Sequence, residues 1–182
     1  FPTVEELYLP INIATYSKGM SLKAVDMEGD GDNDLLVSVR QNYSTTSQGT
    51  MKLLYMVNDG DANFSSSVEV EEAYGIAWDT EVADLDGDND LDIVANDMYG
   101  ISWFRNDGGG NYVRLIIDSV TNGSIIQGDV VSNRSLHLVD LDNDSDLDVV
   151  YTPIIGSVDK RYIRWAKNGA VDCAVLPTVA SS

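Results

Sequence analysis

The stretch Val82-Ala-Asp-Leu-Asp-Gly-Asp-Asn-Asp-Leu-Asp-Ile-Val94 decides how this chain is built. Its central nine residues, 84–92, place a carboxylate at positions 1, 3, 5, 7 and 9, and short apolar runs flank them. Like charges packed this closely repel one another, so a folded chain tolerates them when a cation lies among them. Hard oxygen ligands in this number favour calcium, which takes roughly six to eight oxygens.

The same nine-residue pattern occurs at 26–34 and at 140–148, and we number positions 1 to 9 within each of the three loops. The loops begin at Asp26, Asp84 and Asp140, which are 58 and 56 positions apart. A repeat of this period, with one acidic loop per unit, indicates an array of similar modules. Three such loops predict about three Ca²⁺ ions per chain.

Charge and hydrophobicity restrict the possible partners. The 182 residues carry a formal net charge of −19, and the three loops hold 15 of the 30 acidic residues. The acidity is therefore largely a signature of the loops, and it argues against nucleic acid or an anionic membrane as partner. No apolar run approaches the roughly 20 residues of a membrane helix, so we expect no membrane insertion.

Outside the loops, short apolar runs alternate with Gly, Asn and Asp turns, which is typical of β-strands. Each unit has a strand before its loop, one after it, one that ends in an Asn-Asp-Gly or Asn-Gly turn, and a fourth after that turn. In chain order these are 21–25, 35–39, 52–60 and 64–70; 80–83, 91–95, 101–108 and 112–117; and 135–139, 147–151, 162–169 and 171–175. Four antiparallel strands in a unit of this size predict the blade of a β-propeller.

The predicted fold is therefore all-β, with three blades and one extra outer strand. Residues 1–20 would form the outer strand of a preceding blade, and 21–77, 78–133 and 134–182 would form blades one, two and three. Three blades do not close a ring, because propellers use roughly four to eight. We therefore expect the open faces to pair with further blades of the same polypeptide or with neighbouring subunits, in a ring or a filament. The chain opens with Phe1-Pro2 and looks like a mature or excised piece.

Two other interpretations of the loops are weaker. An EF-hand needs Glu at position 12 and flanking helices, but position 12 is Val37, Ala95 or Tyr151 and the flanks are strands. A solvated acidic turn without metal would be plausible for one loop but not for three in register.

The run 82–94 resembles the FG-GAP/VCBS repeat, which is found in the propellers of integrin α-subunits and in many secreted or surface proteins. The resemblance covers nearly the whole chain and implies that side chains at positions 1, 3, 5 and 9 and the carbonyl at position 7 hold Ca²⁺. Carried over by position, the ligands are Asp26, Glu28, Asp30, Asp32 and Asp34; Asp84, Asp86, Asp88, Asp90 and Asp92; and Asp140, Asp142, Asp144, Asp146 and Asp148.

The chain departs from the family pattern at a few positions. Glu28 is longer than the usual Asp, which predicts a looser first site. Position 6, where Gly is common, is Asn89 in the second loop and Ser145 in the third, and Ser145 predicts backbone strain. The Phe-Gly and Gly-Ala-Pro segments that name the family are absent, so integrin ligand binding is not carried over.

Five Asn-x-Ser/Thr sequons exceed the number expected by chance and favour a secreted or cell-surface glycoprotein, although a polar, turn-rich surface would also explain them. We predict glycans at Asn42, Asn63, Asn122 and Asn133, and we expect Asn143 to stay bare because it lies inside a loop. The single cysteine, Cys173, has apolar neighbours and is expected to be buried.

The residues favour a binding role over catalysis. His137 is the one histidine and lies in an inner strand, so we interpret it as structural, and we expect no enzyme. Tyr55, Trp103 and Trp165 occupy matched positions in the third strands, which favours packing between blades. The leading hypothesis is an extracellular calcium-binding module for structure, adhesion or protein interaction. A carbohydrate-binding propeller, with these aromatics as sugar platforms, and the propeller of a secreted polysaccharide lyase are the alternatives.

Overall fold

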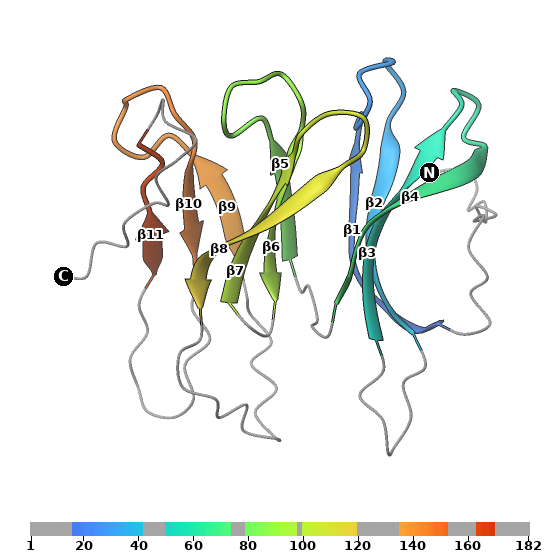
Figure 1. Ribbon diagram of the computed structural model, residues 1–182, viewed down its shortest axis with the longest axis horizontal. Helices are drawn as coiled ribbons and strands as arrows, with labels where there is room; N and C mark the ends of the chain where they lie inside the picture. Colours follow the sequence, from blue (N-terminus) through green and yellow to red (C-terminus); the bar gives the residue numbers. More distant parts are fainter. Residues whose placement is uncertain are drawn as a thin grey trace, which may run out of the picture. The chain divides into compact units, whose positions relative to one another are not determined.

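A computed structural model of the protein describes residues 16–41, 50–73, 79–97, 100–119, 135–152 and 163–169. Every regular element in these ranges is a β-strand (Figure 1). The strands are β1 (Tyr16–Val25), β2 (Asp34–Gln41), β3 (Thr50–Asn58), β4 (Phe64–Ala73), β5 (Asp79–Ala83), β6 (Asp92–Asp97), β7 (Gly100–Asn106), β8 (Tyr112–Ser119), β9 (Leu136–Val139), β10 (Asp148–Tyr151) and β11 (Arg164–Ala166). Within the described ranges, no helix has the length and hydrophobicity that crossing a membrane would require.

The strands form three antiparallel sheets, which confirms the predicted all-β class of blades. Two sheets have four strands, in the orders β1-β2-β3-β4 and β5-β6-β7-β8, and the third has the order β11-β10-β9. Consecutive strands are neighbours throughout, as in a propeller blade. The predicted fourth strand of the third blade, 171–175, and the predicted extra strand lie outside the described residues, apart from the segment 16–20.

That segment belongs to the first sheet. β1 begins at Tyr16, before the predicted blade boundary at residue 21, because Tyr16 pairs with Gln41 and Lys18 pairs with Arg40. Register shifts on either side of Gly19 interrupt this pairing, which explains why the apolar alternation that marks a strand is recognisable only from Ser21 onward.

The chain divides into two compact units, 1–74 and 75–182. The first unit contains the β1–β4 sheet, and its core consists of side chains from the two central strands and the start of β4: Val37, Val39, Leu54, Met56 and Phe64. Inner strands are buried on both faces and therefore read as apolar runs, whereas an outer strand with one solvent face alternates. This contrast explains why β2 is so much more apolar than β4.

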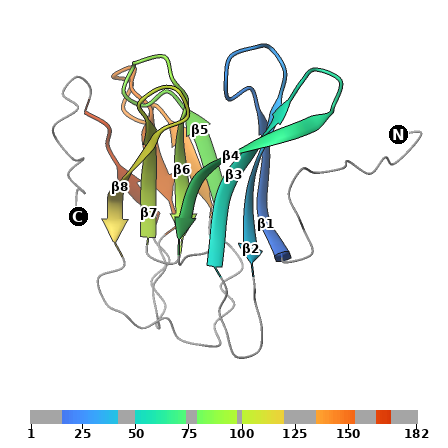
Figure 2. The same cartoon turned by 45° about the vertical axis from the view of Figure 1, so that its right-hand side comes forward.

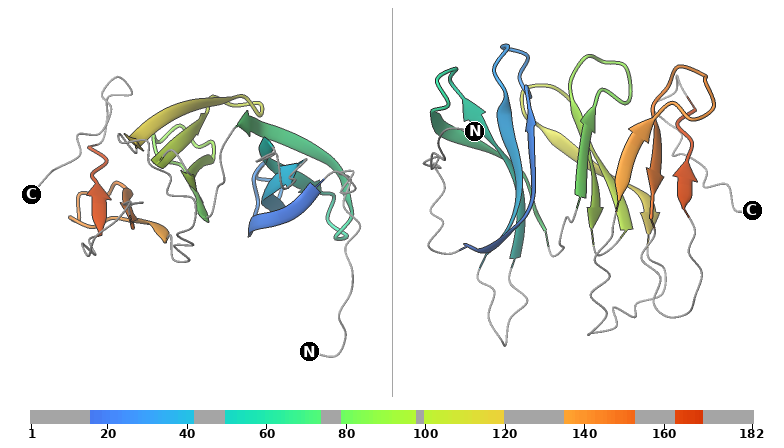
Figure 3. Two further views of the ribbon diagram at one scale, coloured as in Figure 1. Left: turned by 90° about the horizontal axis from the view of Figure 1, so that it is seen from below. Right: turned by 180° about the vertical axis from the view of Figure 1, so that it is seen from behind.

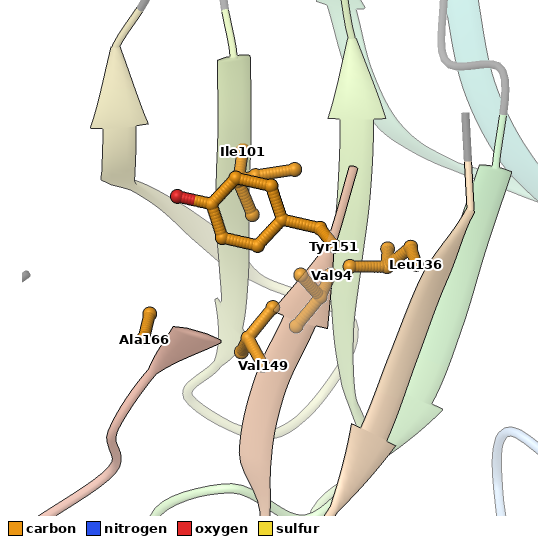
Figure 4. Packing of buried hydrophobic residues seen from close by; sticks show 6 residues of the cluster. All are labelled: Val94, Ile101, Leu136, Val149, Tyr151 and Ala166. Carbon is orange, nitrogen blue, oxygen red and sulfur yellow. The ribbon is translucent and has the colours of Figure 1, made fainter. Parts of the chain in front are cut away.

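The second unit contains two sheets, β5–β8 and β9–β11, which lie next to each other (Figures 2 and 3). They share a hydrophobic core. Val94 of β6 and Ile101 of β7 pack against residues of the other sheet: Leu136 of β9, Val149 and Tyr151 of β10, and Ala166 of β11 (Figure 4). β5 and β9 also lie side by side. Within this unit, the second and third sheets thus bury each other's apolar faces.

Polar contacts fix how these two sheets meet. The Asp79 carboxylate at the start of β5 accepts a hydrogen bond from the backbone N–H of Leu136 at 3.0 Å. At the other side, Asp118 of β8 accepts hydrogen bonds from the Tyr151 hydroxyl at 2.6 Å and from the Arg164 guanidinium. Burial, followed by the Asp118 carboxylate, raises the pKa of Tyr151, so the phenol stays protonated and remains a donor.

Gly100 allows Asp118 to take this position. Its φ is 135°, and a Cβ on Gly100 would lie 1.9 Å from the backbone oxygen of Asp118. The β7–β8 register shift occurs next to this contact, between Ile101 and Ser102. A close approach of two backbones at a bulge is a place where only glycine fits.

We predict that Gly100→Ala destabilises the protein by about 3 kcal/mol, because the backbone of β8 must move and the Asp118 contacts are lost with it. Urea unfolding followed by tryptophan fluorescence measures the change. Gly169→Ala is the matched control, since a Cβ there meets nothing within 4 Å. Equal stability of the two variants would contradict the assigned role of Gly100.

Candidate metal centre

Each acidic loop connects the first strand of its sheet to the second, and position 9 begins that second strand (Figure 1). Asp34, Asp92 and Asp148 therefore start β2, β6 and β10, and all three are 0% exposed. Central strands of a sheet are its most buried elements, so the last carboxylate of each loop is carried into the interior. A buried carboxylate is costly unless it is hydrogen-bonded or paired with a cation.

The three buried aspartates have the same two backbone partners. One oxygen accepts the N–H of position 2, from Met27, Leu85 or Leu141, at 2.8 to 3.1 Å. The other accepts the N–H of an asparagine, at 2.8 to 2.9 Å: Asn58 or Asn106 at the end of the third strand, or Asn168 two residues after it. Each position-9 carboxylate thus ties the start of its loop to the third strand of its sheet.

Position 1 organises the rest of the loop. In the second loop, Asp84 accepts hydrogen bonds from the backbone N–H groups of Gly87, Asp88 and Asn89 at 2.7, 3.2 and 2.9 Å. Asp26 has the same three contacts in the first loop, and Asp140 has the last two of them in the third. Position 5 then accepts the N–H of position 7 in all three loops. These bonds curl the chain around the carboxylates.

The curl requires left-handed backbone at positions 4 and 6. The φ values at position 4 are 73° for Gly29, 79° for Gly87 and 61° for Asn143. At position 6 they are 99° for Gly31, 74° for Asn89 and 78° for Ser145. Glycine and asparagine adopt this conformation readily, whereas serine does so at a cost. Ser145 therefore adopts the left-handed conformation for which the sequence predicts backbone strain.

The loops gather carboxylate oxygens as a metal site does. Oxygens of Asp84, Asp86 and Asp88 lie within 4.8 Å of one another, and so do oxygens of Asp140, Asp142 and Asp148. Among the described residues, the first loop forms no such group, and its position 3 is the longer Glu28. The second and third loops therefore bring predicted ligands together more closely than the first.

Asp86 provides a test of whether a metal fits. Its Oδ1 is buried and has no hydrogen-bond partner within the described residues. A buried carboxylate oxygen without a hydrogen-bond donor is unfavourable in an apolar or acidic setting. A bound cation would supply the missing partner. An all-oxygen donor set suits Ca²⁺, so the residues present fit that ion.

In the first two loops, the side chain at position 7 lies beside the turn that follows the third strand. A Cβ on Gly60 would lie 2.8 Å from Asp32 Oδ2, and one on Gly108 would lie 3.2 Å from Asp90 Oδ2. These two carboxylates thus occupy space beside the turn glycines.

The electrostatics of the loops favour a bound cation. Burial raises the pKa of Asp92 to about 6, although the N–H groups of Asn106 and Leu85 oppose the shift. Partial burial, and then repulsion from Asp34, Asp30 and Asp26, raises the pKa of Glu28. Burial and the Asp88 charge likewise raise the pKa of Asp86. A cation beside any of these carboxylates would reduce the free-energy cost of its charged form.

Two basic side chains stand beside the loops. The Lys167 ammonium pairs with Asp142 and lies 3.0 Å from Asp144 Oδ2, and it lowers the pKa of Asp144. Arg105 Nε lies 4.0 Å from Asp86 Oδ2 and 2.8 Å from Asp107 Oδ1. Both residues directly precede the asparagine that contacts position 9, and sequence reasoning missed both of them.

The asparagines were predicted as turn residues, but their contacts with position 9 were not predicted. The available signal was their recurrence at 58, 106 and 168, one at the end of each third strand. Their side chains add further bonds. Asn58 Nδ2 donates to the Asn33 carbonyl at 3.0 Å, and Asn106 Nδ2 donates to the Leu91 carbonyl at 3.3 Å. In each case the acceptor is position 8 of the loop in the asparagine's own blade. Asn168 Nδ2 instead reaches the Leu85 carbonyl in the second loop, at 3.0 Å.

The aromatic residues of the third strands also face the loops. Burial, followed by the charges of Glu28 and Asp34, raises the pKa of Tyr55, so its phenol lies near the first loop. Trp103 packs against the shared core, and its buried indole nitrogen makes no close hydrogen bond, yet it faces Asp92 closely enough to lower that residue's pKa. Trp103 therefore packs against the shared core, and both side chains lie close to loop carboxylates.

Other predicted residues lie apart from the loops or outside the described ranges. His137 is 71% exposed on β9, and its Nδ1 lies 3.6 Å from Glu81 Oε1. Asn63 is exposed and donates a hydrogen bond from Nδ2 to Asp59 at 2.6 Å. The sequons at Asn42, Asn122 and Asn133, and Cys173, lie outside the described residues.

Residues 26–95 match the family model of the FG-GAP-like repeat, which runs from the first residue of the first loop into β6. This match confirms the resemblance and places that part of the chain in the FG-GAP repeat family. The third loop repeats the hydrogen bonds and backbone geometry of the first two. A comparison with curated proteins found no match.

We predict that Ser145→Gly stabilises the protein by about 1 kcal/mol, because glycine removes the cost of a left-handed serine. Gly31→Ser makes the opposite exchange at the same position of the first loop, where a Cβ meets nothing within 4 Å, and should destabilise by a similar amount. Thermal unfolding measures both. The prediction is wrong if Ser145→Gly lowers the melting temperature.

We also predict that metal-free protein is more stable near pH 5 than near pH 7. The folded-state pKa of Asp92, about 6, lies above its ordinary value of 3.8. The folded state thus binds this proton more tightly, so the stabilisation is fully present below pH 3.8 and is lost as the pH rises through 6. The lowered pKa of Asp144 acts with opposite sign below its ordinary value, outside this window.

Urea midpoints of chelator-treated, dialysed protein at the two pH values test this dependence. Asp86→Asn should flatten the profile, because it removes a second carboxylate whose pKa is raised. A midpoint that is higher near pH 7 than near pH 5 would contradict the prediction.

Proposed function

We propose that this FG-GAP-like repeat protein is a non-catalytic interaction module of β-propeller blades that works outside the cell and is held together by calcium. The observation that carries the proposal is the loop geometry. Three loops of one hydrogen-bonding pattern direct carboxylates inward, and one buried oxygen, Asp86 Oδ1, has no donor among the described residues.

The residues divide the work within each loop. Positions 1 and 9 hold the loop in shape through backbone N–H groups, as Asp84 and Asp92 do in the second loop. At position 3, Asp86 has a buried oxygen without a donor among the described residues, and an oxygen of Asp142 lies close to those of Asp140 and Asp148. Calcium, when bound, would supply positive charge to these oxygens and replace the core that so short a loop lacks. The residues of the second and third loops would hold it by the side chains at positions 1, 3, 5 and 9.

Exposed apolar residues on the third sheet support the proposal that further blades or a neighbouring subunit bind there. Position 2 of the second loop, Leu85, packs against the core shared with the third sheet. The matched residue of the third loop, Leu141, is 49% exposed, and Val139 and Ile163 of the same sheet are also exposed. A further blade placed on the third sheet, as the third lies on the second, would cover Leu141 in the way that Leu85 is covered.

A location outside the cell is supported by two kinds of observation. The sequon excess suits a glycoprotein, and Asn63 is an exposed acceptor. Repeated calcium loops with exposed ligands also suit an environment in which calcium is abundant, because extracellular modules bind it at roughly 10⁻⁴ to 10⁻³ M.

The alternatives have less support. A row of sugar-stacking platforms needs exposed aromatic faces, but Tyr55 is buried and Trp103 packs against the shared core. For a lyase, His137 would need a convergent set of acid and base groups, and the structure gives it Glu81 as a neighbour at 3.6 Å on an exposed strand. No observation in the described residues favours either function over an interaction module.

We predict that Asp86→Asn weakens one calcium site while stabilising the metal-free protein. The substitution keeps the shape of the side chain, removes a ligand charge and relieves repulsion from Asp84 and Asp88. Metal analysis should give about three Ca²⁺ for the parent chain. Calorimetric titration should show one binding constant of the variant reduced at least about tenfold.

The opposite signs make this test decisive. A loop without metal would gain stability from Asp86→Asn in calcium and in chelator alike, whereas a calcium site gains it in chelator and loses it in calcium. Glu69→Gln is the control, because Glu69 pairs with Lys52 on the β3–β4 surface. No bound calcium in the parent chain at millimolar concentration would overturn the proposed function.

A further inference from the structure

Lys167 occupies a special position next to the third loop. It directly follows β11, and its ammonium pairs with Asp142 and lies 3.0 Å from Asp144 Oδ2. These carboxylates are positions 3 and 5 of the loop. Asp142 is also one of the three residues whose oxygens converge within 4.8 Å, together with Asp140 and Asp148.

The matched positions of the other blades differ in charge. The residue before the position-9 asparagine is Val57 in the first blade, Arg105 in the second and Lys167 in the third. Arg105 stays 4.0 Å from Asp86 and pairs more closely with Asp107. The first blade therefore has no positive charge at this position, the second has one at a distance from its loop, and the third has an ammonium in contact with two loop carboxylates.

An ammonium and a calcium ion compete for these oxygens. Calcium requires carboxylate oxygens at about 2.3–2.6 Å, and the Lys167 ammonium uses oxygens of the same two residues. Two cations sharing one carboxylate also repel each other, and a nearby single charge repels a double charge about twice as strongly as another single charge.

The Lys167 side chain can move away while the backbone beside it stays in place. The next residue, Asn168, is fixed by its backbone N–H to Asp148 at 2.8 Å and by its side chain to the Leu85 carbonyl at 3.0 Å. The Lys167 side chain itself is 45% exposed. Its flexible four-carbon stem can therefore swing into solvent while the backbone stays in place.

We propose that Lys167 is a built-in competitor for the third site: its ammonium neutralises the loop when calcium is absent and is displaced when calcium binds. The inference rests on the proposed function, because it presupposes that the third loop binds calcium. The lysine keeps the metal-free loop folded and at the same time lowers the affinity of the loop for calcium. The third site therefore needs more calcium to fill than a loop with the same ligands and no tethered cation would.

Lys167→Met tests the proposal, since methionine keeps much of the length and removes the charge. Calorimetric calcium titration of the full-length variant should show one calcium dissociation constant lowered, on the order of tenfold. In chelator the variant should melt at a lower temperature than the parent chain, and saturating calcium should remove most of this difference. Lys52→Met is the control, because it changes net charge equally but breaks a pair with Glu69 at 2.7 Å.

Displacement can also be followed in the parent chain, in case the variant does not fold without calcium. Amine labelling with mass spectrometry should show Lys167 reacting faster in calcium than in chelator, with Lys52 unchanged. An unaltered set of calcium affinities, with equal losses of melting temperature in calcium and chelator, would overturn the role of Lys167 and leave calcium binding intact. Equal labelling of Lys167 in both conditions would overturn it as well, whereas a parent chain that binds no calcium would overturn both proposals.

Discussion

A buried carboxylate at the end of each acidic loop is the interaction on which the rest of the blade depends. Asp34, Asp92 and Asp148 are fully buried, and each accepts one backbone N–H from its own loop and another from the end of the third strand. Hydrogen bonds to a charged group contribute about 1.5–3 kcal/mol each, which offsets part of the cost of burial. One side chain thereby joins three strands at the same end of the sheet.

The remaining loop geometry follows from this anchor. A chain that leaves the first strand and returns within nine residues must turn sharply, and it does so around the position-1 carboxylate with left-handed residues at positions 4 and 6. The third strand must bring its asparagine N–H to position 9, and in the first two blades the turn glycine, Gly60 or Gly108, must be small enough to pass the position-7 side chain. The acidic loop and the Asn-Asp-Gly turn are therefore two halves of one structure.

The sequence predicts those parts whose causes are local. Period-2 alternation, the apolar central strands and the spacing of the carboxylates were sufficient for the strands, the sheets and the loops. Contacts between sheets leave no such trace. The Asp118 contacts with Tyr151 and Arg164 span 33 and 46 residues, and Asn168 meets Leu85 across 83. The early start of β1 was missed for a related reason, because register shifts next to Gly19 erase the alternation.

The division of labour among loop positions explains how one scaffold can carry three different acidic loops. Positions 1 and 9 are engaged with backbone N–H groups on both oxygens, as in Asp26 and Asp34, so changing them would disturb the loop itself. Position 3 and the residue before the asparagine contribute nothing comparable to the backbone. They can therefore vary, as Glu28, Asp86 and Asp142 do at the first and Val57, Arg105 and Lys167 at the second. Variation at these two positions changes the charge beside the loop carboxylates while the blade keeps its fold.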